Sequence, residues 1–154
     1  FITCSDSRVL AELITQSKPG DLFVVKNVGN IVPPASVTGS TNSTAAAIEF
    51  AVDALKVSDI AVCGHSQCGA MEALLRGLPP ESGMSHLQDA ASEENVLFAL
   101  ENLHSYPSVE KRLADGSLRL HGWFFKIASA ELFAFDPESK QFLPLGADEP
   151  APPA

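Results

Sequence analysis

The chain has 154 residues, of which 45% are hydrophobic and 19% charged, a composition that fits one globular domain with a sizeable core. The net charge of −9 disfavours nucleic acids and anionic membranes as partners, because both require basic patches. Nothing resembles a transmembrane helix of about 18 apolar residues or a signal peptide. The three cysteines, an odd number, favour reduced thiols at a metal site, with one spare, and therefore a cytoplasmic location.

The first third of the chain alternates apolar segments with helical patterns. Residues 1–4 predict a strand and roughly 9–17 a helix. The run 22–28 is almost continuously apolar or β-branched, which predicts a strand covered on both faces, as in a parallel sheet. The chain starts abruptly inside a strand, so we expect a missing N-terminal part. A lost targeting segment and a bacterial microcompartment therefore stay open as alternatives to a simple cytoplasmic location.

A loop over 29–41 leads to the next helix, for which Ser43 or Thr44 is the expected N-cap. Its predicted buried stripe has helical spacing and comprises Ile48, Ala51, Val52 and Leu55. A buried strand is expected at 59–63. The helix after it, at about 69–77, is predicted from the spacing of Met71, Leu74, Leu75 and Leu78.

The last part of the chain adds helices and then strands. Residues 84–92 are polar and predict no element, whereas 93–104 predicts a helix and Pro107 starts a short one. Strands are expected at 118–127, with a bulge at Gly122, and at 132–135. The order β-α-β-α-β-α-α-β-β predicts a single α/β domain over 1–147, with a mainly parallel sheet flanked by helices. The proline-rich tail 148–154 is predicted to be disordered.

Two segments that carry cysteine each follow a strand and precede a helix. They are 4–8 (CSDSR) and 63–70 (CGHSQCGA). Because the carboxyl ends of parallel strands share one edge, we expect Cys4, His65 and Cys68 to converge there, with Asp6 and Arg8 beside them. Thiolate and imidazole are ligands that zinc accepts readily. A His-x-x-Cys turn alone is weak evidence, but the two segments together are specific.

These two motifs resemble the β-class carbonic anhydrases, and further segments extend the resemblance over nearly the whole chain: 20–30 (GDLFVVKNVGN), 45–51 (AAAIEFA), 101–103 (ENL) and 106–109 (YPSV). The resemblance implies a three-layer α/β fold and a carbonate dehydratase. It also implies a homodimer or larger homo-oligomer whose sheet runs across the interface. Two departures stand out: the N-terminal helices of the family are absent, and the segment 78–93 is short, through either a deletion or residues missing from the sequence.

Two thiolates and one imidazole leave one position of a tetrahedral zinc open, which is typical of catalytic rather than structural sites. Two thiolates also cancel the charge of the metal, so a bound water needs help to ionise. We assign this help to Asp6, which would orient a zinc-bound hydroxide toward carbon dioxide. Arg8 would hold Asp6 ionised and in place. Alternatively, Asp6 binds zinc as a fourth ligand and expels the water. By resemblance, Val28 and Gly69 are expected to contact the substrate.

Simpler interpretations accompany these assignments. Cys63 is expected to be an inert core thiol, and the Asp6–Arg8 pair could be only structural. Other side chains are expected to be surface or core residues without a site role: His86, His104, His121, Phe124, Phe125, Phe133 and Phe135. The rival functions are a carbonyl sulfide or carbon disulfide hydrolase, a non-catalytic assembly protein stabilised by zinc, and a dithiol redox protein that uses Cys4 and Cys68.

Overall fold

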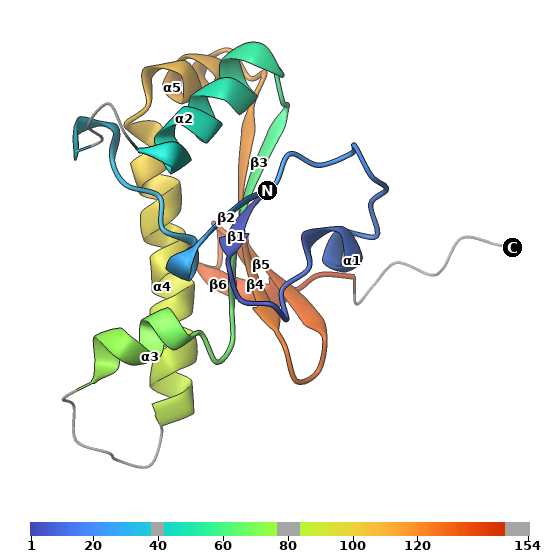
Figure 1. Ribbon diagram of the computed structural model, residues 1–154, viewed down its shortest axis with the longest axis vertical. Helices are drawn as coiled ribbons and strands as arrows, with labels where there is room; N and C mark the ends of the chain where they lie inside the picture. Colours follow the sequence, from blue (N-terminus) through green and yellow to red (C-terminus); the bar gives the residue numbers. More distant parts are fainter. Residues whose placement is uncertain (38–41, 77–83, 147–154) are drawn as a thin grey trace, which may run out of the picture.

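The fold is built on one six-stranded sheet, shown in the computed structural model of Figure 1. The structure describes residues 1–37, 42–76 and 84–146, with Met84 by its backbone only. The strands lie in the order β2-β1-β3-β4-β5-β6. Their bounds are β1 Ile2–Cys4, β2 Val25–Asn27, β3 Asp59–His65, β4 Arg119–Lys126, β5 Glu131–Asp136 and β6 Gln141–Pro144.

The sheet is mixed. Strands β2, β1, β3 and β4 are parallel to one another, whereas β5 and β6 are antiparallel additions joined by tight turns. The predicted α/β class and mainly parallel core are confirmed, and β6 is a strand that the sequence did not reveal. The parallel part matters for function because β1 and β3 end at the same edge.

In the part of the chain that the structure describes, five α-helices accompany the sheet: α1 Ala11–Thr15, α2 Ser43–Glu49, α3 Gly69–Leu75, α4 Met84–His104 and α5 Pro107–Ala114. The long helix α4 packs along β3 and β4, and α1 lies on the other side of the sheet (Figure 1). The main core lies between α4 and the sheet, where Val62, Val96, Leu103, Tyr106 and Val109 are fully buried. Within the described ranges, no helix is long and apolar enough to span a bilayer.

Several strand predictions need correction. Within residues 22–28 only Val25–Asn27 forms a strand, β2. It lies at the edge of the described sheet, next to β1, and is half-buried, so the prediction of a strand covered on both faces was wrong. Strand β3 runs to His65, two residues beyond the expected end. The register of β3 and β4 is uninterrupted at Gly122, so the expected bulge is absent there. The glycine instead admits α4, since an added Cβ would lie 3.0 Å from Leu100 Cδ1.

A helix exists at each predicted place, but the bounds, the caps and the buried faces differ from the predictions. Helix α2 is capped by Asn42, whose Oδ1 accepts from the Ala45 amide at 2.9 Å, rather than by Ser43 or Thr44. A π-helical turn, Phe50–Ala54, follows it and rotates Leu55 off the buried face, leaving that side chain 47% exposed.

In α3 only Met71 is buried and Leu74 is exposed, so its predicted stripe was wrong. Helix α4 begins at Met84, although 84–92 predicted no element. Its N-terminal turns carry mostly polar side chains, which hid the helical period. Leu78, the segment around it and the tail 148–154 lie outside the described residues, and the division into a domain over 1–147 and a tail stays a prediction.

Candidate metal centre

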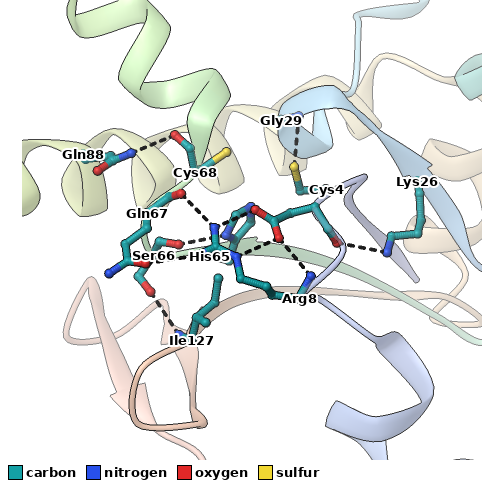
Figure 2. Close-up of polar contacts among 11 residues, drawn as sticks. Cys4, Arg8, Lys26, Gly29, His65, Ser66, Gln67, Cys68, Gln88 and Ile127 are labelled. Carbon is teal, nitrogen blue, oxygen red and sulfur yellow. Dashed lines mark hydrogen bonds and ion pairs between the residues drawn. The ribbon is translucent and has the colours of Figure 1, made fainter.

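Three potential metal ligands meet at the carboxyl edge of the parallel strands. Each of Cys4, His65 and Cys68 offers one ligand atom, and these atoms lie within 4.8 Å of one another. Strand register explains the meeting, because Thr3 pairs with Cys63 and both strands leave the sheet a residue or two later. Cys68 then enters from the cap position of α3. The structure thus brings together the three predicted residues (Figure 2).

The imidazole of His65 is fully buried and oriented by its own loop. Its Nδ1 lies 2.8 Å from the carbonyl oxygen of Ser66, an arrangement in which Nδ1 carries the proton. Its Nε2 is buried and has no hydrogen-bond partner among the described residues. Burial lowers the pKa of His65, which favours the neutral ring that binds metals. An orphaned Nε2 beside two sulfurs therefore fits a metal ion.

Both sulfurs are withdrawn from solvent, with Cys4 6% and Cys68 1% exposed. The Gly29 amide donates to Cys4 Sγ at 3.4 Å. Burial, with a smaller contribution from the nearby Cys4, raises the pKa of Cys68, and this outweighs the helix amides that favour its thiolate. The helix amides therefore favour the Cys68 thiolate but do not by themselves outweigh the cost of burying its charge. A divalent cation between the two sulfurs would do so.

The Asp6 carboxylate and the Arg8 guanidinium form a two-bond pair beside the ligands. Arg8 donates from Nε to Oδ1 at 2.9 Å and from Nη2 to Oδ2 at 2.7 Å. These bonds hold the pKa of Asp6 well below its usual range, because they favour the ionised form. Arg8 is held in turn by Gln67, whose side-chain oxygen lies 3.1 Å from Nη1 and whose carbonyl oxygen lies 3.3 Å from Nη2.

Sequence reasoning missed Gln67, although it lies between His65 and Cys68 in the motif. It also missed Gln88 and Asn95 of α4, which donate to the Cys68 and Gly29 carbonyls. The available signal was only indirect: once 84–104 is known to be one helix, these two carboxamides fall on one face of it.

The other residues singled out in the sequence do not lie among the three potential ligands. Val28 is 71% exposed, and an added Cβ at Gly69 would meet no atom within 4 Å among the described residues, so both face open space, and their proposed contact with substrate stays a prediction. Cys63 is fully buried, as expected, and burial raises its pKa to about 12. His104 contacts Glu110 and His121 contacts Asp59, both away from the three ligands.

An apolar cavity of about 330 Å³ lies at the other end of the strands. It is lined by side chains that include Leu22, Phe23 and Ile60 and by none of the metal-site residues. Its position corresponds to the amino ends of the parallel strands, where α/β sheets rarely bind substrates. The chemistry-bearing side chains therefore lie apart from this cavity.

A mixed α/β sheet with two thiols and an imidazole gathered at the carboxyl edge of its parallel strands defines a candidate metalloprotein. Comparison with known proteins narrows this class. The family model "Carbonic anhydrase" matches residues 1–90 and 80–132. The two matched parts overlap at residues 80–90, within the segment 78–93 that is expected from the resemblance to be short. The chain belongs to the β-carbonic anhydrase family.

Named relatives agree with this family. The chain is 42% identical to a carbonic anhydrase of Synechocystis sp., over 88% of this chain and 58% of that protein. It is 41% identical to one of Pseudomonas aeruginosa, over 94% of this chain and 76% of that protein. The chain thus spans little more than half of the cyanobacterial relative and about three quarters of the other.

Solved structures support the fold independently. The β-carbonic anhydrase CcaA superimposes with a TM-score of 0.85 at 39% identity, covering 94% of this chain and 82% of that one. A β-carbonic anhydrase of Sordaria macrospora, described as tetrameric, superimposes with a TM-score of 0.75 at 29% identity, covering 86% and 77%. The predicted family and fold are therefore confirmed.

Proposed function

We propose that this protein is a zinc-dependent carbonic anhydrase that reversibly hydrates carbon dioxide to bicarbonate and a proton. The observation that carries the proposal is the meeting of Cys4, His65 and Cys68 within 4.8 Å, with the Asp6–Arg8 pair beside them. Family membership supports the same reaction class.

Zinc is the ion that best suits this donor set of two sulfurs and one imidazole nitrogen. Cys4, Cys68 and His65 Nε2 would hold it, and Ser66 would keep the histidine ring oriented through its carbonyl oxygen. When bound, zinc supplies a Lewis acid that lowers the pKa of water, to about 7 at an unrelated three-histidine site. Three protein ligands would leave room for that water.

Asp6 is the group that we assign to orient the attacking water. Its ionised carboxylate can accept a hydrogen bond from the water and direct an oxygen lone pair at the carbon of carbon dioxide. The water oxygen forms the new C–O bond, and the proton that it loses passes to solvent. Arg8 holds Asp6 ionised and in place, and both carboxylate oxygens already point to the guanidinium. This arrangement favours the open site over Asp6 as a fourth ligand.

We also propose that the protein forms a homo-oligomer of at least two copies. The tetrameric solved relative supports this, as does the exposed edge of β2 next to the exposed side chains of Val28 and Phe50. A cytoplasmic location stays a prediction.

The test is stopped-flow carbon dioxide hydration by protein whose zinc content has been measured. Asp6→Asn should keep its zinc and lose about 100-fold or more in rate, because a neutral carboxamide is a weaker acceptor than a carboxylate and carries an NH2 donor in place of one oxygen. Asp59→Asn is a matched control: Asp59 also forms a two-bond pair, with Arg119 at 2.8 and 3.0 Å, but lies away from the site. Its rate should stay within about twofold of the wild type.

Other results would decide against the proposal. Wild-type protein without zinc, or an Asp6→Asn variant as active as the wild type, would exclude the mechanism. Faster turnover of carbonyl sulfide or carbon disulfide than of carbon dioxide would favour the hydrolase alternative on the same scaffold. Equimolar zinc without any turnover would favour a structural role for the metal.

A further inference from the structure

Three carboxamide side chains on α4 repeat at an interval of seven residues. Gln88, Asn95 and Asn102 each donate their side-chain N–H to a backbone carbonyl oxygen of another segment. The acceptors are Cys68 at 2.9 Å, Gly29 at 2.8 Å and Val32 at 2.8 Å. We call this set, Gln88, Asn95 and Asn102, the carboxamide ladder.

The seven-residue interval places the carboxamide ladder on one face of the helix. Seven residues make almost two turns of an α-helix, so successive members lie about 10 Å apart along the axis. A helix of 21 residues is a stiff rod on this scale. The helix therefore keeps the backbone carbonyls that bind to successive members at a fixed separation.

Two members of the carboxamide ladder act on the two halves of the metal centre. Gln88 binds the carbonyl of Cys68, which is itself a candidate ligand (Figure 2). Asn95 binds the carbonyl of Gly29. The Gly29 amide in turn donates to the sulfur of Cys4 (Figure 2). Helix α4 thus touches Cys68 directly and Cys4 through one intervening residue.

Gly29 is well suited to transmit this restraint. Its φ of 76° lies in the left-handed region, which fixes the direction of its amide. An added Cβ would lie 3.0 Å from the Cβ of Ala70, so the turn at Gly29 packs closely against the first turn of α3. A shift of Gly29 would therefore move its amide away from Cys4 Sγ and disturb the start of α3, which follows Cys68.

We propose that Gln88 and Asn95 are positioning residues that set the separation of the two sulfurs, with α4 as their common support. This inference rests on the proposed function, because it assumes that the centre binds zinc. Asn102 makes the same kind of bond, but its acceptor, Val32, has no described contact with a sulfur. It therefore stabilises the loop without reaching the metal.

The experiment compares Asn95→Ala with Asn102→Ala in zinc-loaded protein. Both variants lose one carboxamide hydrogen bond of 2.8 Å from the same helix, so both should unfold at lower temperature. Transfer of zinc to a chromophoric chelator should be about tenfold or more faster in Asn95→Ala, as for lost outer-shell partners at other metal sites. In Asn102→Ala the rate should stay within about threefold of the wild type.

A spectroscopic measurement separates positioning from general stability. In cobalt-substituted protein, the thiolate-to-cobalt absorption band should shift in Asn95→Ala, because a sulfur loses its oriented N–H donor, and should not shift in Asn102→Ala. If zinc leaves both variants equally fast, or Asn95→Ala releases it at the wild-type rate, the proposal is overturned. If Asn95→Ala does not fold, Gln88→Ala replaces it in the same comparison, under the same criterion.

Failure of this proposal is distinguishable from failure of the proposed function. The wild type is first assayed for zinc content and carbon dioxide hydration. Wild-type protein that binds no zinc contradicts both proposals. Wild-type protein that binds zinc and hydrates carbon dioxide, with equal zinc release from the two asparagine variants, contradicts only the role of the carboxamide ladder.

Discussion

The guanidinium of Arg8 engages both carboxylate oxygens of Asp6, from Nε at 2.9 Å and from Nη2 at 2.7 Å. Lysine cannot form this fork, because an ammonium group is a point charge without a planar pair of donors. Arg8→Lys should therefore keep zinc but lower carbon dioxide hydration by about tenfold or more.

The same variant should change the pH dependence of activity. The bonds from Arg8 lower the pKa of Asp6, so the ionised carboxylate persists to a lower pH than usual. Weakening them raises this pKa toward its ordinary value of about 3.9, so the ratio of variant to wild-type activity should be constant above about pH 6 and fall only below about pH 5, where Asp6 begins to take up a proton. Arg119→Lys, which alters the remote pair with Asp59, is the control. If Arg8→Lys and Arg119→Lys lost the same fraction of their activity, Arg8 would have no special role.

The three cysteines should differ in reactivity. Cys4 and Cys68 would be protected by zinc and become available after chelation, whereas Cys63 is fully buried and its pKa is raised to about 12. Alkylation at pH 8, followed by mass spectrometry, should modify none of them in the zinc form and two after metal removal. The third should react only in denaturant. Modification of Cys63 before Cys4 or Cys68 would contradict the assignment of the spare thiol.

Gly64 is expected to be essential for the close packing of β3 and α4. An added Cβ would lie 2.8 Å from Val96 Cγ2 and 3.1 Å from the carbonyl oxygen of Ser92. Gly64→Ala should lower the free energy of unfolding by ~1–3 kcal/mol, as overpacking typically does. Gly69→Ala is the matched control in urea denaturation, since its Cβ would meet no described atom within 4 Å. If both variants lost the same free energy of unfolding, packing against α4 would not be the cause.

The Asp59–Arg119 pair should make stability depend on pH. Hydrogen bonds, chiefly from Arg119, hold the pKa of Asp59 well below its unfolded value of about 3.9. A lowered folded pKa stabilises the protein above the unfolded pKa, and this contribution is lost as the pH falls below it. The stability difference between wild type and Asp59→Asn should thus shrink as the pH falls below about 4.

Urea denaturation of metal-free protein measures this difference without interference from zinc loss. The effect should be small, because the Asp59 and Arg119 side chains are 39% and 70% exposed. A difference that is the same at pH 3 and pH 7 would show that the substitution acts through packing or through the unfolded state instead.

The sequence alone predicted which side chains gather at the candidate metal centre. Cys4 ends one predicted strand and is followed by Asp6 and Arg8, whereas His65 and Cys68 follow another predicted strand. These assignments depend only on local spacing and on the rule that parallel strands end at a common edge. Such local patterns survive errors in the bounds of individual elements, and β3 extending to His65 changed none of them.

Only the tertiary structure decided what holds that centre in place. Its surroundings are long-range contacts that no local pattern encodes. They are the hydrogen bonds from Gln88 and Asn95, the bond between Gln67 and Arg8, and the close packing of α4 on Gly64. The exposure of Leu55 and the edge position of β2 likewise depend on how a turn rotates and on which strands pair. Residue type and spacing select the potential ligands, whereas packing between distant segments sets their geometry, because the partners that fix it lie far away along the chain.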